Sequence, residues 1–346
     1  MNVMTCYSVK NIVEKLFLLF MMGFAFCACG DDESYTLGVW HRRSDFDGLA
    51  RGSAAGFTIA DKGYVCGGYT GTTYKRVTDL WEYDIQGGYW TQCASMPDAA
   101  TARTGASGFA IGEKGYITLG QDNYLADTWE YDPATDTWTQ KDDYKGGARI
   151  SAIAFGIGQY GYVGTGYNGN YQKDFYRFDP QAAAGQQWEI VNGFGGQKRQ
   201  GGTSFVIDDK AYICCGVNNG SYVYDFWCFD PSTGVFTQLR DIADTSDDDY
   251  DDDYTSIVRA NAVSFVIDGK GYLVTGEYGS LLSNYWIYDP ATDLWEGEDL
   301  TAFEGSVRKN AVAFSTGTRG FVVTGQASSS YYDDTWELSP YEYEEE

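Results

Sequence analysis

The chain repeats one order of apolar and polar positions six times. Each unit begins with an arginine, runs through small residues to an aromatic residue, turns, and reaches a second aromatic residue followed by a glycine. The unit then continues with a loop and, in its usual form, an Asp-x-aromatic step. It ends with a second turn and a last aromatic residue. Because no long amphipathic helical stretch appears after the N-terminus, the pattern predicts an all-β chain of short strands. The units begin at Arg51, Arg103, Arg149, Arg199, Arg259 and Arg308.

A second set of residues keeps the same register as the arginines, and a third set follows in each unit. The second-strand aromatic residues follow the arginines at equal steps, although the intervals between units vary from 46 to 60 residues. Such agreement predicts copies of one supersecondary unit. The second-strand residues are Tyr64, Tyr116, Tyr162, Tyr212, Tyr272 and Phe321, and the third-strand residues are Trp81, Trp129, Tyr176, Trp227, Trp286 and Trp336.

One phrase recurs almost unchanged in residues 127–140 and 284–296. Its Asp132-Pro133 step suits a type I turn, because aspartate accepts backbone N–H bonds and proline presets φ at the next position. The turn folds the third strand onto the fourth. Trp129 and Trp138 then bury apolar area between neighbouring sheets, so each unit needs such a pair of rings.

A period near 50 residues with four short strands per unit is typical of β-propellers. Over residues 36–340 the chain resembles the kelch repeat family. Kelch units usually carry two glycines after the second strand, and here only Gly67-Gly68 keeps both. The resemblance implies an all-β, six-bladed kelch-type β-propeller.

The sixth unit lacks its own fourth strand. Trp90, Trp138, Trp188, Phe236 and Trp295 end the first five units, whereas only ten residues follow Trp336. We expect residues 36–40 to supply the missing outer strand and close the ring, since closure leaves no long sheet edge. Residues 341–346 are then expected to form an acidic tail.

The first 28 residues are typical of a signal peptide. Two lysines precede an apolar run at residues 16–26, which is too short to span a bilayer. Ala28-Cys29 resembles the lipobox of bacterial lipoproteins, so we expect a lipid on Cys29 and an acidic tether at residues 29–35. This predicts a bacterial, extracytoplasmic protein at the outer membrane or cell surface, with the lipid as its only membrane contact. A buried N-terminal helix is the alternative.

The formal charge of −25 excludes nucleic acid as an expected partner, because phosphate backbones are bound through lysine and arginine. Five cysteines remain beyond Cys29, and their odd number and spacing favour neither a disulfide framework nor a zinc site. We expect most of these cysteines to act as small apolar residues in strands. A disulfide from Cys228 to Cys214 or Cys215 is the alternative. The five are Cys66, Cys93, Cys214, Cys215 and Cys228.

The loops between second and third strands are expected to share one face with the connectors that carry the arginines. They are longer than the tight turns of the other face, and specificity usually lies in such loops. Tyrosine, asparagine, serine and glycine together form an adaptable recognition surface, although they are also good turn residues. The candidate ligand-binding residues are Tyr69, Tyr124, Tyr167 and Tyr278.

The six arginines precede small residues, which suit first strands that converge on an axis. We expect them to ring one mouth of the central channel. In some kelch proteins arginines at this position grip acidic ligands, and a guanidinium suits bidentate carboxylate binding. The alternative is that each arginine pairs with a carboxylate of a neighbouring blade.

The longest connector carries the acidic run Asp247–Asp253. Clustered oxygens suit calcium, but the run lacks the glycine and terminal glutamate of an EF-hand loop. A solvated, mobile loop is the preferred interpretation, and we expect no metal and no cofactor.

Two relatives implied by the resemblance are enzymes. Galactose oxidase needs two histidines beside tyrosines for its copper, and this chain has only His41, so that chemistry is excluded. Sialic acid mutarotase needs no metal, and Glu277 with the arginines could supply its acid, base and cationic groups. We expect a binding module for an extracytoplasmic glycan or protein, neutral or anionic, with a metal-independent sugar mutarotase as the alternative.

Overall fold

The computed structural model describes residues 35–73, 75–121 and 123–345. Residues Leu37–Glu344 form one compact unit, to which the following description applies. The predicted signal peptide and the lipidated Cys29 lie outside the described residues. In the described part of the chain no helix is long and apolar enough to cross a membrane.

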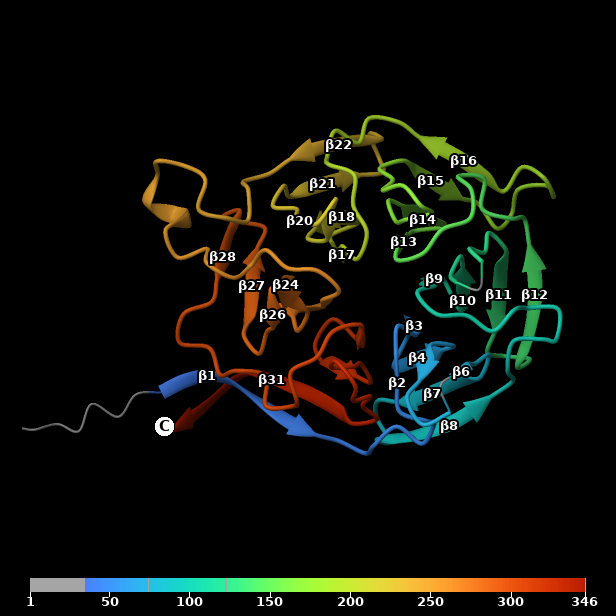
Figure 1. Ribbon diagram of the computed structural model, residues 1–346, viewed down its shortest axis with the longest axis horizontal. Coiled ribbons are helices and arrows are strands. Elements are labelled where there is room, and N and C mark those ends of the chain that lie inside the picture. Colours follow the sequence, from blue (N-terminus) through green and yellow to red (C-terminus); the bar gives the residue numbers. More distant parts are fainter. Residues whose placement is uncertain (1–34, 74, 122, 346) are drawn as a thin grey trace, which may run out of the picture. The chain divides into compact units, whose positions relative to one another are not determined.

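Six four-stranded sheets, here called blades 1 to 6, make up most of this unit (Figure 1). They correspond to the six sequence units, and the strands are given from the innermost outward. Blade 1 contains β3 (Ala55–Ile59), β4 (Lys62–Cys66), β7 (Leu80–Asp84) and β8 (Tyr89–Cys93), and blade 2 contains β9 (Ser107–Ile111), β10 (Lys114–Thr118), β11 (Thr128–Asp132) and β12 (Thr137–Lys141). Blade 3 contains β13 (Ile153–Ile157), β14 (Tyr160–Gly164), β15 (Phe175–Phe178) and β16 (Trp188–Val191), and blade 4 contains β17 (Thr203–Ile207), β18 (Lys210–Cys214), β21 (Trp227–Asp230) and β22 (Val235–Gln238). Blade 5 contains β23 (Val263–Ile267), β24 (Lys270–Val274), β27 (Tyr285–Asp289) and β28 (Leu294–Glu296), and blade 6 contains β29 (Val312–Ser315), β30 (Gly320–Val323), β31 (Thr335–Glu345) and β1 (Tyr35–Arg42).

Short strands in the loops between blade strands form three smaller sheets. The described residues contain one helical element, a single turn of 3-10 helix, η1 (Asp249–Asp251), in the connector between blades 4 and 5. The small sheets contain β2 (Arg51–Gly52), β5 (Tyr69–Thr70) and β6 (Lys75–Arg76); β19 (Val217–Asn218) and β20 (Ser221–Tyr222); and β25 (Glu277–Tyr278) and β26 (Ser280–Leu281).

The innermost strands form a closed ring around a central axis. Strands β3, β9, β13, β17, β23 and β29 each contact the next innermost strand, and β29 contacts β3 again. Within each blade, rings from the first and second strands stack, as Phe57 does on Tyr64 at 4.8 Å between centroids. In five blades a glycine precedes the second-strand aromatic residue and leaves room for a ring of the adjacent blade, since a Cβ on Gly115 would lie 2.2 Å from Phe57. Blade 4 has Ala211 at this position. The all-β propeller prediction is confirmed.

A closed circle of six backbone hydrogen bonds joins the blades at one end of this ring. The residue two positions after each arginine donates its N–H to the carbonyl of its counterpart in the preceding blade, at 2.8–3.0 Å. All six residues have φ between 51° and 63°, a left-handed conformation that glycine and asparagine adopt most easily. They are Ser53, Gly105, Ser151, Gly201, Asn261 and Asn310.

The N-terminal strand closes the propeller as expected. Strand β1 is the outermost strand of blade 6 and pairs with β31. Trp40 from β1 is 2 % exposed and packs edge-on against Phe303, at 4.9 Å between ring centroids. The far end differs from the prediction, because β31 runs to Glu345 and so includes most of the expected acidic tail. Its Tyr341 hydroxyl donates to Asp268 at 2.9 Å.

Candidate functional site

The six arginines that begin the units are buried, each with at most 1 % of its surface exposed. Each guanidinium donates from Nε to the carbonyl two residues earlier and from Nη1 to the carbonyl sixteen residues later. For Arg51 these acceptors are Leu49, at 2.8 Å, and Gly67, at 3.0 Å. The side chain therefore ties the connector before the blade to the end of the second strand.

Five of these guanidinium groups also form an ion pair with an aspartate that lies one or two residues before the third strand of the same blade. In blade 2, Arg103 binds Asp127 through two hydrogen bonds of 2.7 and 2.6 Å. The same carboxylate accepts the indole N–H of Trp129 at 2.6 Å. The Asp-x-Trp step thus places one carboxylate between a buried cation and a buried indole. The pairs are Arg51–Asp79, Arg103–Asp127, Arg149–Asp174, Arg199–Asp225 and Arg308–Asp334.

Aromatic rings complete the environment of four of these arginines. The residue five positions before the arginine lies beneath the guanidinium, as Phe46 does below Arg51 at 4.9 Å. Such cation–π contacts stabilise a desolvated guanidinium. The other three pairs are Arg149–Tyr144, Arg199–Phe194 and Arg308–Phe303.

Blade 5 departs from this arrangement. The residue before its third strand is Asn284, whose Oδ1 and backbone carbonyl each accept a hydrogen bond from Arg259 at 3.1 Å. No carboxylate of the described residues pairs with Arg259, and burial lowers the pKa of its guanidinium to about 10. This exception was not predicted, although the sequence Asn284-Tyr285-Trp286 shows asparagine where the other units have aspartate.

The structure corrects the expected exposure of the arginine ring. The guanidinium groups do not line the channel mouth, because they are buried against carbonyl groups and, in five blades, an aspartate of the same blade. The alternative prediction, that each arginine pairs with a carboxylate of a neighbouring blade, is also wrong. The aspartate partners belong to the same blade as the arginine. A ligand would have to displace these internal partners to reach a guanidinium, so the accessible chemistry of this face lies in its loops.

The central channel is narrow and lined by small residues of all six innermost strands. Its middle holds a cavity of about 230 Å³ between residues such as Ala54, Gly108 and Ala152. A cavity of about 150 Å³ lies at the mouth formed by the circle of hydrogen-bonded residues. At the other end, a cavity of about 390 Å³ is lined partly by Phe57, Phe109, Phe205, Phe265 and Phe314.

Tyrosines from the loops between second and third strands pair across neighbouring blades. Tyr222 and Tyr278 lie 4.7 Å apart between ring centroids, and Tyr278 is 48 % exposed. All four tyrosines predicted from the sequence take part in such contacts. The pairs are Tyr69–Tyr331 at 6.0 Å, Tyr124–Tyr167 at 6.5 Å and Tyr222–Tyr278 at 4.7 Å.

Glu277 lies beside the channel mouth. Its Oε1 accepts a hydrogen bond of 2.9 Å from the side chain of Asn261, whose residue lines the mouth cavity. Its Oε2 forms an ion pair of 2.7 Å with Lys309, the residue after Arg308. Carboxylate, amide and ammonium groups are therefore brought together at the mouth by blades 5 and 6.

Comparison with known proteins agrees with this architecture. The sequence profile of the Kelch motif family matches residues 50–97 and 198–241. The chain is a kelch-repeat β-propeller.

A solved structure titled "Structure of YjhT" superposes on this kelch propeller with a TM-score of 0.67. The match covers 85 % of this chain and 95 % of that chain at 14 % sequence identity, and a likeness at that identity concerns the fold alone. A comparison with curated protein sequences found no significant match.

The acidic connector of the kelch propeller contains one aspartate that is buried and hydrogen-bonded. Asp251 is buried, and it accepts backbone N–H bonds from Thr245 and Ser246, both at 3.0 Å. Burial raises the pKa of this carboxyl, but the hydrogen bonds outweigh burial and hold the pKa below its usual value. The carboxylates of Asp244, Asp251 and Asp252 have ligand atoms within 4.8 Å of one another, a grouping that exposed acidic residues often form without an ion. The segment therefore folds around Asp251, whereas the other five aspartates of the run are exposed as expected.

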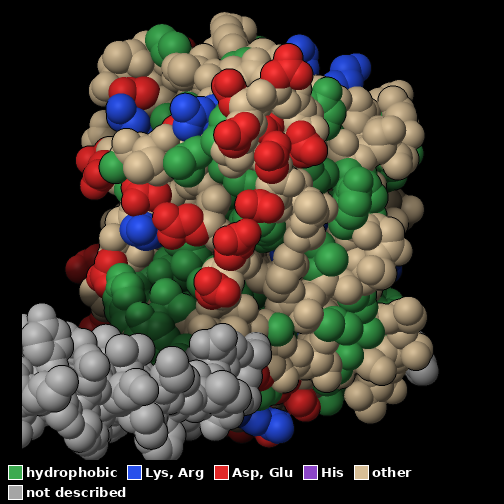
Figure 2. All heavy atoms as spheres, turned by 90° about the vertical axis from the view of Figure 1, so that its left-hand side faces the viewer, with side chains coloured by type: hydrophobic (Ala, Val, Ile, Leu, Met, Phe, Trp, Pro, Cys, Tyr) green, Lys and Arg blue, Asp and Glu red, His purple; other side chains and the backbone are tan. Residues whose placement is uncertain are grey.

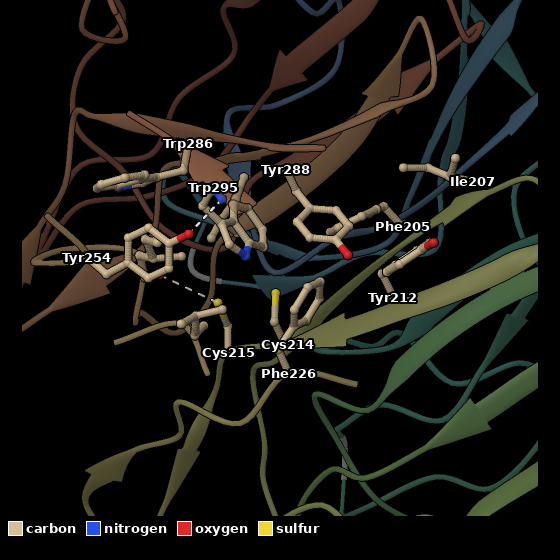
Figure 3. Packing of buried hydrophobic residues seen from close by; sticks show 13 residues of the cluster. Phe205, Ile207, Tyr212, Cys214, Cys215, Phe226, Tyr254, Trp286, Tyr288 and Trp295 are labelled. Carbon is tan, nitrogen blue, oxygen red and sulfur yellow. Dashed lines mark hydrogen bonds between the residues drawn. The ribbon is translucent and has the colours of Figure 1, made fainter. Parts of the chain in front are cut away.

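The five cysteines of the kelch propeller are free, so no bridge links Cys228 to Cys214 or Cys215. Cys214 and Cys215 are buried in the aromatic cluster shared by blades 4 and 5, beside Phe226 (Figure 3). This agrees with their expected role as small apolar residues.

Proposed function

We propose that the propeller is a binding module that holds an extracytoplasmic glycan or protein on its tyrosine-bearing loop face. The observation that carries this proposal is the set of partly exposed tyrosine pairs that bridge neighbouring blades near the channel mouth. Such rings offer rigid apolar surface and a hydroxyl group at little entropic cost, which suits the faces of sugar rings as well as peptides. The buried arginines act on this face as positioning residues, because they fix the ends of the strands from which the loops leave.

Export and anchoring belong to the same proposal. They rest on the apolar segment at residues 16–26 and on Cys29 after Ala28. A lipid on Cys29 would hold the propeller at the outer membrane or cell surface, where glycans and surface proteins are available. Metabolic labelling with a palmitate analogue tests this step, and labelling that persists in Cys29→Ala would contradict it.

A glycan microarray with the purified full-length protein tests the binding proposal. Tyr69→Ala and Tyr278→Ala should each weaken retention on bound glycans by up to about tenfold, since stacking aromatic rings contribute on the order of 0.5–1.5 kcal/mol. Tyr89→Ala is the matched control, because Tyr89 is 54 % exposed but begins β8, directly after the tight turn from β7. Equal losses in all three variants would contradict binding through the loop face.

A metal-independent mutarotase is the second candidate, and the position of Glu277 favours it. Interconversion of anomers needs a proton moved from the anomeric hydroxyl and a proton delivered to the ring oxygen, which a carboxylate paired with donors can perform. Proton NMR of anomerically pure N-acetylneuraminate, with and without the protein, decides between the two candidates. Acceleration that Glu277→Gln abolishes supports the enzyme, and an unchanged rate of interconversion contradicts it.

A further inference from the structure

The connector between blades 4 and 5 is the longest of the propeller, and its residues help to line a pocket. As in blades 1, 3, 4 and 6, the aromatic residue five positions before the arginine packs on the third-strand ring: Tyr254 meets Trp286 edge-on at 5.9 Å. The extra residues add Tyr250, which lies edge-on to Tyr254 at 6.0 Å. The pocket between these rings and Trp295 measures about 280 Å³.

Hydrogen bonds hold the walls of this pocket in place. The backbone N–H of Trp295 donates to the Tyr254 hydroxyl at 2.8 Å, and the Trp286 indole donates to Ser256 at 3.3 Å. Figure 3 shows Tyr254 directed toward Trp295, with Trp286 beside both rings. Tyr254, Trp286 and Trp295 are all buried, so the aromatic walls are preformed.

Three carboxylates line the rim of this pocket: Asp253, Glu296 and Glu298. All three side chains are exposed, and none forms an ion pair within the described part of the chain. The neighbouring run from Asp247 to Asp252 extends the negative surface, and acidic side chains gather on this side of the molecule (Figure 2). Aromatic walls with an acidic rim complement a group that is apolar along its stem and cationic at its tip.

The ring of Tyr250 already carries such a cation. The guanidinium of Arg240, an exposed residue, lies 4.7 Å from the Tyr250 ring centroid. It also donates to the carbonyl of Thr292 at 3.2 Å. A second cation entering beside Tyr250 would therefore depend on the rim carboxylates to offset repulsion from Arg240.

We infer that this pocket receives a lysine side chain from a basic segment of a partner polypeptide, with the acidic run contacting further cations of that segment. A polypeptide is favoured over a free amine because the acidic surface continues for several residues beyond the pocket. The residues that line this pocket include none of the paired loop tyrosines, so the inference does not depend on the function proposed above.

Titration calorimetry of the full-length protein with N-acetyl-tetralysine amide tests the inference, in the presence of EDTA so that no divalent cation occupies the acidic run. The double variant Glu296→Gln/Glu298→Gln should weaken binding about tenfold, because it removes two of the three rim charges. The control Asp98→Asn/Glu113→Gln changes the net charge equally at two exposed positions elsewhere. Its affinity should change less than twofold.

An aromatic variant and a second ligand complete the experiment. Tyr250→Ala should weaken tetralysine binding about fivefold, whereas Tyr343→Ala, at an exposed tyrosine of β31, should leave it unchanged. Equal losses in the two double variants would show attraction by net charge alone and would overturn the inference. Binding of tetramethylammonium as tight as that of tetralysine would overturn the polypeptide as the occupant.

Discussion

Blades 4 and 5 hold the same buried arginine in two different ways. In blade 4 the guanidinium of Arg199 forms an ion pair with Asp225, whose side chain is 8 % exposed. In blade 5 Arg259 is equally buried but meets the neutral amide of Asn284. Both arginines still bind the carbonyl two residues earlier and the carbonyl sixteen residues later.

The difference separates two roles of the groups around the arginine, which are to accept its hydrogen bonds and to neutralise its charge. Five blades combine both roles. The hydrogen bonds to backbone carbonyls are common to all six blades, so they are the part that the propeller geometry requires. Charge neutralisation by a carboxylate is absent from blade 5, and burial there lowers the pKa of the arginine. Blade 5 therefore keeps an uncompensated cation in the interior, at a cost in stability that the other blades avoid.

The largest expected effect comes from removing the carboxylate in blade 4. Asp225→Ala leaves Arg199 charged and unpaired, and it removes the acceptor for the Trp227 indole and the Gln197 N–H. We expect the free energy of unfolding in urea to fall by about 3–5 kcal/mol. Asn284→Ala should cost only about 1–3 kcal/mol, since no ion pair is lost. Equal losses would show that the two sites do not differ as described.

A gain is expected when blade 5 receives the missing carboxylate. Asn284→Asp pairs a cation that is already buried, so desolvation of the arginine is not an added cost. We expect the free energy of unfolding to rise by about 1–2 kcal/mol at pH 7. Thermal and urea unfolding should agree, and a loss of stability would mean that the neutral acceptors suit Arg259 better than a carboxylate does.

The response to acid should also distinguish the carboxylate blades. Burial of Asp334 raises the pKa of its carboxyl, but the hydrogen bonds and charge of Arg308 outweigh burial and lower the pKa below the ordinary 3.8. The stability from this pair is therefore complete above the ordinary pKa and is lost as the pH falls through the lowered one. Urea midpoints between pH 2 and 5 should fall less steeply in Asp334→Asn than in the natural protein. Identical slopes would contradict a lowered pKa.

The smallest effect concerns the indole that shares the carboxylate. Trp336 donates to Asp334 at 2.7 Å, whereas Trp286 donates to the Ser256 hydroxyl at 3.3 Å. Replacement by phenylalanine keeps most of the apolar surface and removes the donor. We expect Trp336→Phe to cost about 1.5 kcal/mol and Trp286→Phe about 0.5 kcal/mol beyond their common loss of volume, measured by urea unfolding. A reversed order would show that the carboxylate contributes nothing to the indole contact.

The repeat pattern was sufficient to predict the strands, the propeller and the closing strand, because aromatic and glycine positions report which side of each strand is packed. The burial of the arginines could not be predicted in the same way. The Asp-x-aromatic step was recognised as a marker of the third strand, but its contact with an arginine 24 to 28 residues earlier depends on how the intervening loop returns. Local sequence does not encode that path, so the guanidinium groups were expected at the surface, where arginines usually lie.

The loops show the same limit on a smaller scale. Tyr69 and Tyr278 were identified as candidates from composition, yet their partners Tyr331 and Tyr222 come from adjacent blades. The run at Asp247–Asp253 was expected to repel itself, because like charges usually remain solvated. Asp251 is buried instead, because three donors of residues 245 and 246 bind its carboxylate. The turn that places these donors cannot be predicted from a repeat pattern.

The circle of backbone hydrogen bonds at residues 53, 105, 151, 201, 261 and 310 has a consequence for motion. No single blade can move outward without breaking hydrogen bonds to both of its neighbours, so the opening of the channel behaves as one rigid ring. Deuterium should therefore enter these six amides together and only during unfolding of the whole ring. A ligand of the proposed loop face would have to bind outside this ring, because the opening does not widen.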